Sequence, residues 1–139
     1  MSRYASSVVA LVALLSATAA DAVQYVTPVP LAKSVTTPVG NVQPGPVQVP
    51  VITWGGDIAT VHANGNAAVT TANSVFGKLG LQLRLVREDV FSKQLEAYLA
   101  GRSPYLRGTM GMINMAAEAA ARDPRTKPVV IYQMTWSAG

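Results

Sequence analysis

From Val49 onward, the apolar positions of the chain follow two spacings in turn. Short runs at 49–54, 81–86 and 129–132 predict strands, because they are rich in β-branched residues or alternate apolar with polar positions. Apolar residues three or four positions apart predict helices over 66–80, 88–101 and 113–123. The stretch 105–112 is interrupted by glycines and predicts a brief strand and a turn.

This alternation predicts an α/β fold, a partial doubly wound lobe with a mainly parallel sheet and helices on both sides. Residues 49–54 and 129–132 are apolar throughout, so we expect them in the centre of the sheet. Residues 81–86 alternate strictly and are expected at an edge. The chain ends soon after 129–132, before any helix that could cover a central strand, so we expect 49–139 to be a truncated N-terminal lobe.

The first 48 residues have a different composition. Arg3, the apolar run Val8 to Leu15 and the small-x-small pattern Ala20-Asp21-Ala22 predict a cleaved signal peptide over 1–22. An apolar N-terminal helix of the domain is the alternative. Six prolines between Val26 and Pro50 predict a Pro-rich disordered linker over 23–48.

The charges of the chain narrow the classes of partner. It has 11 Lys and Arg against 7 Asp and Glu, a net charge of +4, and these charges are spread along the sequence. No basic patch with stacking aromatics is visible, which argues against nucleic-acid binding. The chain has no Cys, hence no disulfide and no lipobox cysteine, and with a signal peptide this predicts a periplasmic or secreted protein.

Three expected strand ends carry similar polar turns: "TWGGDIAT" (53–60), "RGTMGM" (107–112) and "TWSAG" (135–139). Each combines glycine, which lets a ligand approach the backbone, with a hydroxyl side chain. Ligands of open parallel sheets bind beyond the carboxyl ends of the strands. We therefore expect glycines 55, 111 and 138 to meet at the rim of one binding cleft, although each segment alone is more typical of an ordinary turn.

Catalytic residues find less support in the sequence. His62 is the only histidine, and a solvated or capping role is favoured over that of a base. Asp57 is expected to cap a helical turn or to bind a ligand, and Glu88 and Asp89 are expected to offset a helix dipole. The methionines at 110, 112 and 115 are expected in the core rather than at a metal. No zinc spacing, P-loop or GxSxG motif occurs, so we expect no enzyme, metal or cofactor.

The segments "VITWGGDIAT", "SVFGKLGLQLRLVRED" and "KPVVIYQMTWSAG" carry a resemblance that covers 49–139. The chain resembles the N-terminal part of periplasmic solute-binding proteins of ABC transporters, in the type II group of nitrate, taurine (sulfonate) and phosphate binders. The resemblance implies capture of an oxyanion or small organic anion for delivery to a membrane permease. It also implies ligand contacts from Thr53, Trp54, Gly55, Gly56, Asp57, Thr109, Gly111, Met112, Thr135, Trp136 and Ser137.

Two further hypotheses belong to other classes. The chain could be a secreted α/β interaction module on a Pro-rich tether, with no role in transport. An exported hydrolase that uses His62 as its base is the least favoured hypothesis.

Overall fold

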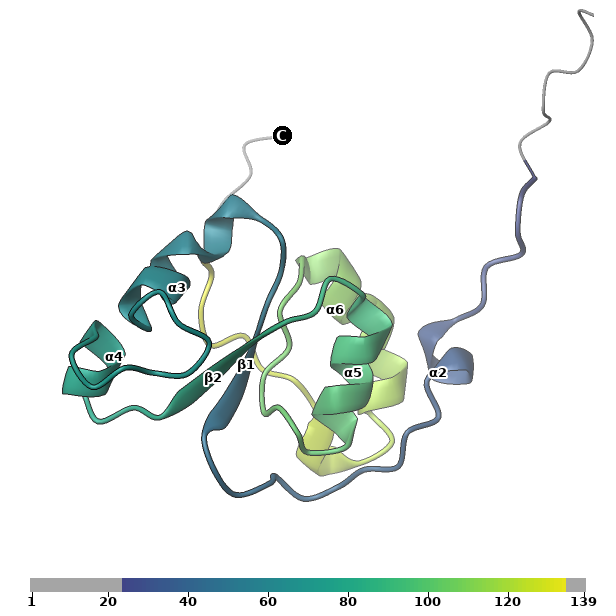
Figure 1. Cartoon of the computed structure of the whole chain (residues 1–139). Helices are drawn as coiled ribbons and strands as arrows, with labels where there is room; N and C mark the ends of the chain where they lie inside the picture. Colours follow the sequence, from purple (N-terminus) through teal and green to yellow (C-terminus); the bar gives the residue numbers. More distant parts are fainter. Residues whose placement is uncertain (1–23, 135–139) are drawn as a thin grey trace, which may run out of the picture.

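The computed structural model describes residues 24–134, which form a mixed α/β fold (Figure 1). A two-stranded parallel sheet lies in the middle, with α3 and α4 on one face and α5 and α6 on the other. The predicted α/β class, with a parallel sheet and flanking helices, is confirmed. In chain order the elements are α2 (Leu31–Ser34), β1 (Val47–Val51), η2 (Gly55–Asp57), α3 (Ile58–Ala63), α4 (Val75–Lys78), β2 (Leu83–Arg87), α5 (Phe91–Leu99), α6 (Met110–Ala120) and η3 (Pro124–Thr126).

The two strands pair in a register that runs from Val47 opposite Leu83 to Val51 opposite Arg87. Pro50 lies inside β1, whereas the sequence placed it at the start of a strand. The N–H of Val47 donates to Gln82, and successive N–H groups of a strand point to opposite edges. The ring of Pro50 therefore lies on the edge of β1 that faces away from β2, where its missing N–H breaks no hydrogen bond of the pair.

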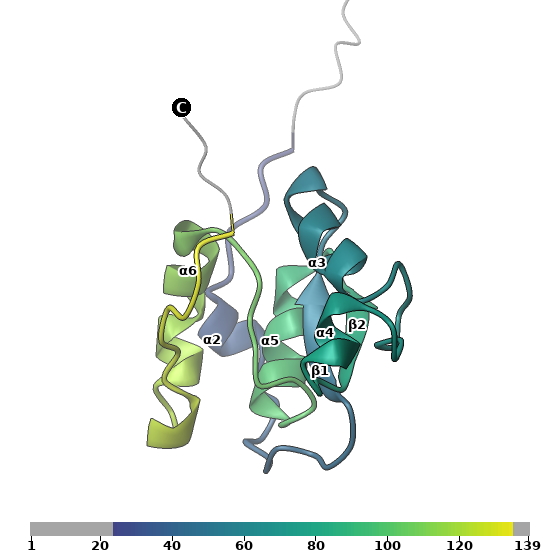
Figure 2. The same ribbon diagram turned by 90° about the vertical axis from the view of Figure 1, so that its left-hand side faces the viewer.

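The hydrophobic core lies on the α5 side of the sheet, among α2, α5 and α6 (Figure 2). The face of α5 predicted from the spacing is confirmed, since Phe91, Leu95 and Leu99 are buried and Tyr98 packs against them. α6 contributes Ala116 and Ala119, whose small side chains allow close helix packing. The predicted helix 113–123 therefore exists, although it begins three residues earlier and ends at Ala120.

Part of the Pro-rich segment belongs to this core, which the sequence did not predict. Val35, directly after α2, is only 1% exposed. The guanidinium of Arg122 donates to the carbonyls of Val35 and Ala32, which holds the segment against the end of α6. Proline density predicted the largely irregular backbone, but it could not predict that single apolar side chains would anchor it.

The predicted helix 66–80 is mostly wrong. Only α4 is helical there, and a second short helix, α3, occupies 58–63, where a turn was expected. Gly65 and Asn66 both have positive φ, and this backbone ends α3. The chain then runs back along β2, where Val69 forms an antiparallel bridge with Arg84.

Two expected strands are absent from the described residues. Residues 105–109 have no regular structure, and the turn expected at 109–112 is the start of α6. Residues 129–132 have no regular secondary structure and pair with no described strand, and the exposed fractions of their side chains lie between 68% and 79%. The brief strand expected within 105–112 and the central strand expected at 129–132 are therefore wrong for this structure. No helix within 24–134 is long and apolar enough to cross a membrane.

Candidate functional site

The end of β1 and the segment before α6 meet through a buried ion pair. The Nε of Arg107 donates to Oδ1 of Asp57 at 2.9 Å, and their side chains are 14% and 4% exposed. Oδ2 of Asp57 accepts the N–H of Ile52 at 2.8 Å. Asp57 therefore does not cap a helix with its side chain. It joins the segment after β1 to the segment before α6, which the sequence placed at the end of a strand but which follows α5 and an irregular stretch.

Arg107 has one group without a partner. Its Nη2 is buried and has no hydrogen-bond acceptor among the described residues. The guanidinium also lies over the ring of Trp54, with Cζ 5.3 Å from the ring centroid, a distance typical of cation–π contacts. Trp54 itself is 50% exposed. The cluster Trp54–Asp57–Arg107 thus combines a buried, uncompensated donor with an aromatic surface open to solvent.

The backbone of Arg107 is fixed by Gln94 on α5. The Oε1 of Gln94 accepts the Arg107 N–H at 3.0 Å, and its Nε2 donates to the Glu88 carbonyl at 2.7 Å. Gln94 is buried at 3% exposure. This amide therefore ties the end of β2, α5 and the Arg107 segment into one unit, which leaves the guanidinium little freedom to move away from Asp57.

Thr53 is engaged by Asp89. Both its N–H and its hydroxyl donate to the carboxylate, at 2.5 and 2.7 Å. These bonds, the backbone bond first, hold the pKa of Asp89 below its ordinary 3.8. A structural role was predicted for Asp89, but its partner is the β1 turn and not the dipole of α5.

The other expected contact residues divide into four groups. Gly55 and Gly111 are exposed, and a Cβ on either would meet nothing closer than 3.8 Å, so the backbone there is open to approach. Gly56 is half-buried within η2. Thr109 caps α6 by accepting the Met112 N–H, and Met112 packs against the core. Thr135, Trp136, Ser137 and glycine 138 lie outside the described residues.

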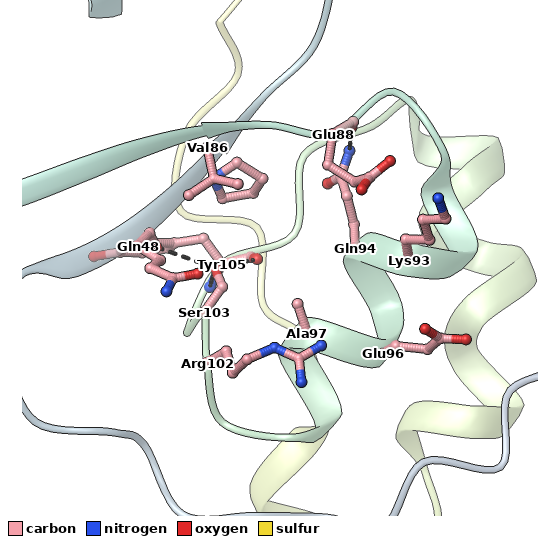
Figure 3. A pocket seen from close by; sticks show the side chains of 11 residues that line it. Gln48, Val86, Glu88, Lys93, Gln94, Glu96, Ala97, Arg102, Ser103 and Tyr105 are labelled. Carbon is pink, nitrogen blue, oxygen red and sulfur yellow. Dashed lines mark hydrogen bonds between the residues drawn. The ribbon is translucent and has the colours of Figure 1, made fainter. Parts of the chain in front are cut away.

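A concave feature of the surface lies between the sheet and α5 (Figure 3). It is a cavity of about 310 Å³ whose lining combines apolar side chains with both signs of charge. The charged residues are Glu88, Lys93, Glu96 and Arg102. The sequence analysis did not predict this cavity, because it depends on how α5 sits over the strands.

The remaining candidates are His62, possible metal ligands and the methionines. His62 is exposed on α3. No group of three or more His, Cys, Asp or Glu side chains within 24–134 could hold a metal ion. Met110 and Met115 are 58% and 59% exposed, so the prediction of core packing is wrong for them and holds only for Met112.

Comparisons of the chain with protein-family models, with curated proteins and with solved structures found no match. The resemblance to periplasmic solute-binding proteins therefore stays a prediction. The best candidate for a binding site is the group of side chains around Arg107, a residue that the sequence motifs did not single out. A basic residue just before the "GTMGM" turn was the available signal, but its buried partner could not be identified from the sequence.

Proposed function

We propose that this chain captures a small anionic solute outside the cytoplasm, an oxyanion or small organic anion, for delivery to an ABC transporter permease. The observation that carries the proposal is the buried, unpartnered Nη2 of Arg107 beside the exposed ring of Trp54. Extracytoplasmic location and delivery to a permease rest on the signal-like N-terminus and on the resemblance of the strand-end motifs.

An anionic oxygen satisfies the donor that the fold leaves unpaired. Buried N–H groups nearly always have an acceptor, and one without a partner costs about 1–3 kcal/mol. The planar guanidinium suits nitrate, sulfonate or phosphate oxygens, which accept hydrogen bonds from its fork. Because Asp57 already neutralises Arg107, the site favours a small anion held by hydrogen bonds over a highly charged one.

The surroundings support a site of this kind. The ring of Trp54 provides a flat apolar wall, and the exposed backbone of Gly55 lies on the same turn. Thr109, two residues after Arg107, begins α6. Capture of a solute by these groups requires no bond to be made or broken, in agreement with a binding protein.

Isothermal titration calorimetry of the full chain with nitrate, phosphate, bicarbonate and taurine tests the proposal. We expect saturable binding of at least one anion, and an affinity about tenfold lower in Arg107→Lys, which keeps the charge but loses the Nη2 donor. The control Arg84→Lys changes an exposed side chain on β2 and should bind like the wild type. No binding of any anion, or equal loss in both variants, would contradict the proposal.

One observation favours the interaction module as a second function. Val129, Val130, Ile131 and Tyr132 form an extended run with side chains at least 68% exposed. Such a stretch can add as a strand to the sheet edge of a partner. If the chain self-associates through it, Ile131→Lys should convert an oligomer into a monomer in sedimentation experiments, and a wild-type monomer would argue against this form of the function.

A further inference from the structure

The cavity between the sheet and α5 has features that the proposed anion site does not use. Its floor includes Pro50 and Val86, which lie opposite each other in the register of the two strands, and Ala97 of α5. At about 310 Å³ it is within the lower part of the range for sites of small molecules. An apolar floor of this kind binds the hydrocarbon part of a solute.

Opposite charges stand at the rim without pairing. Glu88 follows β2, and Lys93 lies on the first turns of α5, so both border the same end of the cavity (Figure 3). Neither side chain forms an ion pair within the described part of the chain. One carboxylate oxygen of Glu88 accepts the N–H of Val90 at 3.0 Å, which fixes the direction of the carboxylate.

The charged residues in the lining of the cavity indicate which class of ligand it can bind. The lining includes two acids, Glu88 and Glu96, and two bases, Lys93 and Arg102, so its formal charge is zero. A simple anion meets repulsion from the acids, and a simple cation meets repulsion from the bases. A ligand that carries both charges is attracted by both, since each of its charges has an opposite partner.

We propose that this cavity binds a small zwitterion, an α-amino acid with an apolar side chain. Its ammonium group pairs with Glu88, its carboxylate pairs with Lys93, and its side chain covers Val86 and Ala97. Gln94 lines the cavity and also holds the backbone of Arg107, so the two sites share one wall but no charged group.

The experiment is calorimetric titration of the full chain with leucine, N-acetylleucine and leucine methyl ester. The two derivatives each lack one of the charges while keeping the apolar side chain. We expect leucine to bind and each derivative to bind at least about tenfold more weakly, as expected for the loss of one charged contact. Equal binding of either derivative, or no binding of leucine at millimolar concentration, would overturn the proposal.

Variants that remove single charges from the lining test whether leucine binds in this cavity. Glu88→Gln keeps an acceptor for the Val90 N–H but removes the charge, and Lys93→Gln removes the opposite charge. We expect each to weaken leucine binding about tenfold, while Lys78→Gln on α4, which is exposed and does not line the cavity, leaves it unchanged. Arg107→Lys should also leave it unchanged. Loss of leucine binding in Arg107→Lys but not in Glu88→Gln would place the amino acid at Arg107 and overturn the proposal.

Discussion

Asp57 and Arg107 are fifty positions apart in the chain, and the Nε of Arg107 donates to Oδ1 of Asp57 at 2.9 Å. Asp57 is buried and Arg107 is half-buried, and the Asp57 carboxylate also accepts the Ile52 N–H. The pair thereby joins the end of β1 to the segment that leads into α6. It also positions Nη2 of Arg107, the one buried side-chain polar atom that has no hydrogen-bond partner among the described residues.

Removal of one partner from this pair is expected to be costly. Asp57→Asn leaves the Arg107 charge buried and uncompensated, so the free energy of unfolding should fall by about 3–5 kcal/mol. The double variant Asp57→Asn with Arg107→Gln should be less destabilised than the sum of the two single variants, because both charges are then gone. Urea denaturation measures all three values, and additive effects would show that the two residues do not interact.

The Thr53–Asp89 contact predicts a measurable pKa. NMR titration of the carboxyl group should show the Asp89 pKa below 3.8, because Thr53 donates two hydrogen bonds to the charged form. Because the pKa of Asp89 is lower in the folded protein than its ordinary 3.8, the contact stabilises the fold at pH values above 3.8. This contribution to stability is lost as the pH falls through the pKa of the folded state. Thr53→Val removes the hydroxyl bond but keeps the backbone bond, so it should move the pKa part of the way back to 3.8. An Asp89 pKa at or above 3.8 in the wild type would contradict the contact.

Two glycines form a matched pair for a steric test. Gly80 and Gly101 have nearly equal φ, +75° and +72°, so alanine is strained by a similar amount at both, about 1–2 kcal/mol. A Cβ at 80 meets nothing within 4 Å, whereas at 101 it would lie 2.1 Å from the Asn41 carbonyl oxygen. Gly101→Ala should therefore lower the thermal midpoint clearly more than Gly80→Ala. Equal midpoints would mean that the 40–42 segment does not pack against the end of α5.

The position of Leu95 in the core predicts that its truncation destabilises the fold by leaving a cavity. Leu95 is fully buried among α2, α5 and α6, so Leu95→Ala should cost about 2–5 kcal/mol. Leu79→Ala, at a position 70% exposed, should change the stability by no more than about 0.5 kcal/mol. Chemical denaturation compares the two, and similar costs would contradict the placement of the core.

The sequence predicted the parts of the fold that depend on local periodicity. The apolar face of α5 and the alternating β2 are both present, because their spacing matches one regular element. It failed between 58 and 80, where Gly65 and Asn66 adopt positive φ and redirect the chain. It also failed at 129–132, where an apolar composition predicted a strand that lacks a pairing partner in this structure.

The expected place of the candidate site stays a prediction, because residues 135–139 lie outside the described structure. The segments 53–60 and 107–112 meet through Asp57 and Arg107, although the second of them does not follow a strand. The side chains of Thr53, Asp57 and Thr109, however, form hydrogen bonds within the protein. The residue with a buried donor that has no acceptor among the described residues is Arg107, and no local pattern distinguishes it from the other arginines of the chain.

The most direct test of the anion site follows the Arg107 guanidinium by ¹⁵N NMR while nitrate or phosphate is added to the full chain. We predict that the Arg107 Nη2 resonance shifts and saturates with the dissociation constant found by calorimetry, while that of exposed Arg84 does not. An unchanged Arg107 resonance at saturating anion, or equal shifts at both arginines, would contradict an anion site at Arg107.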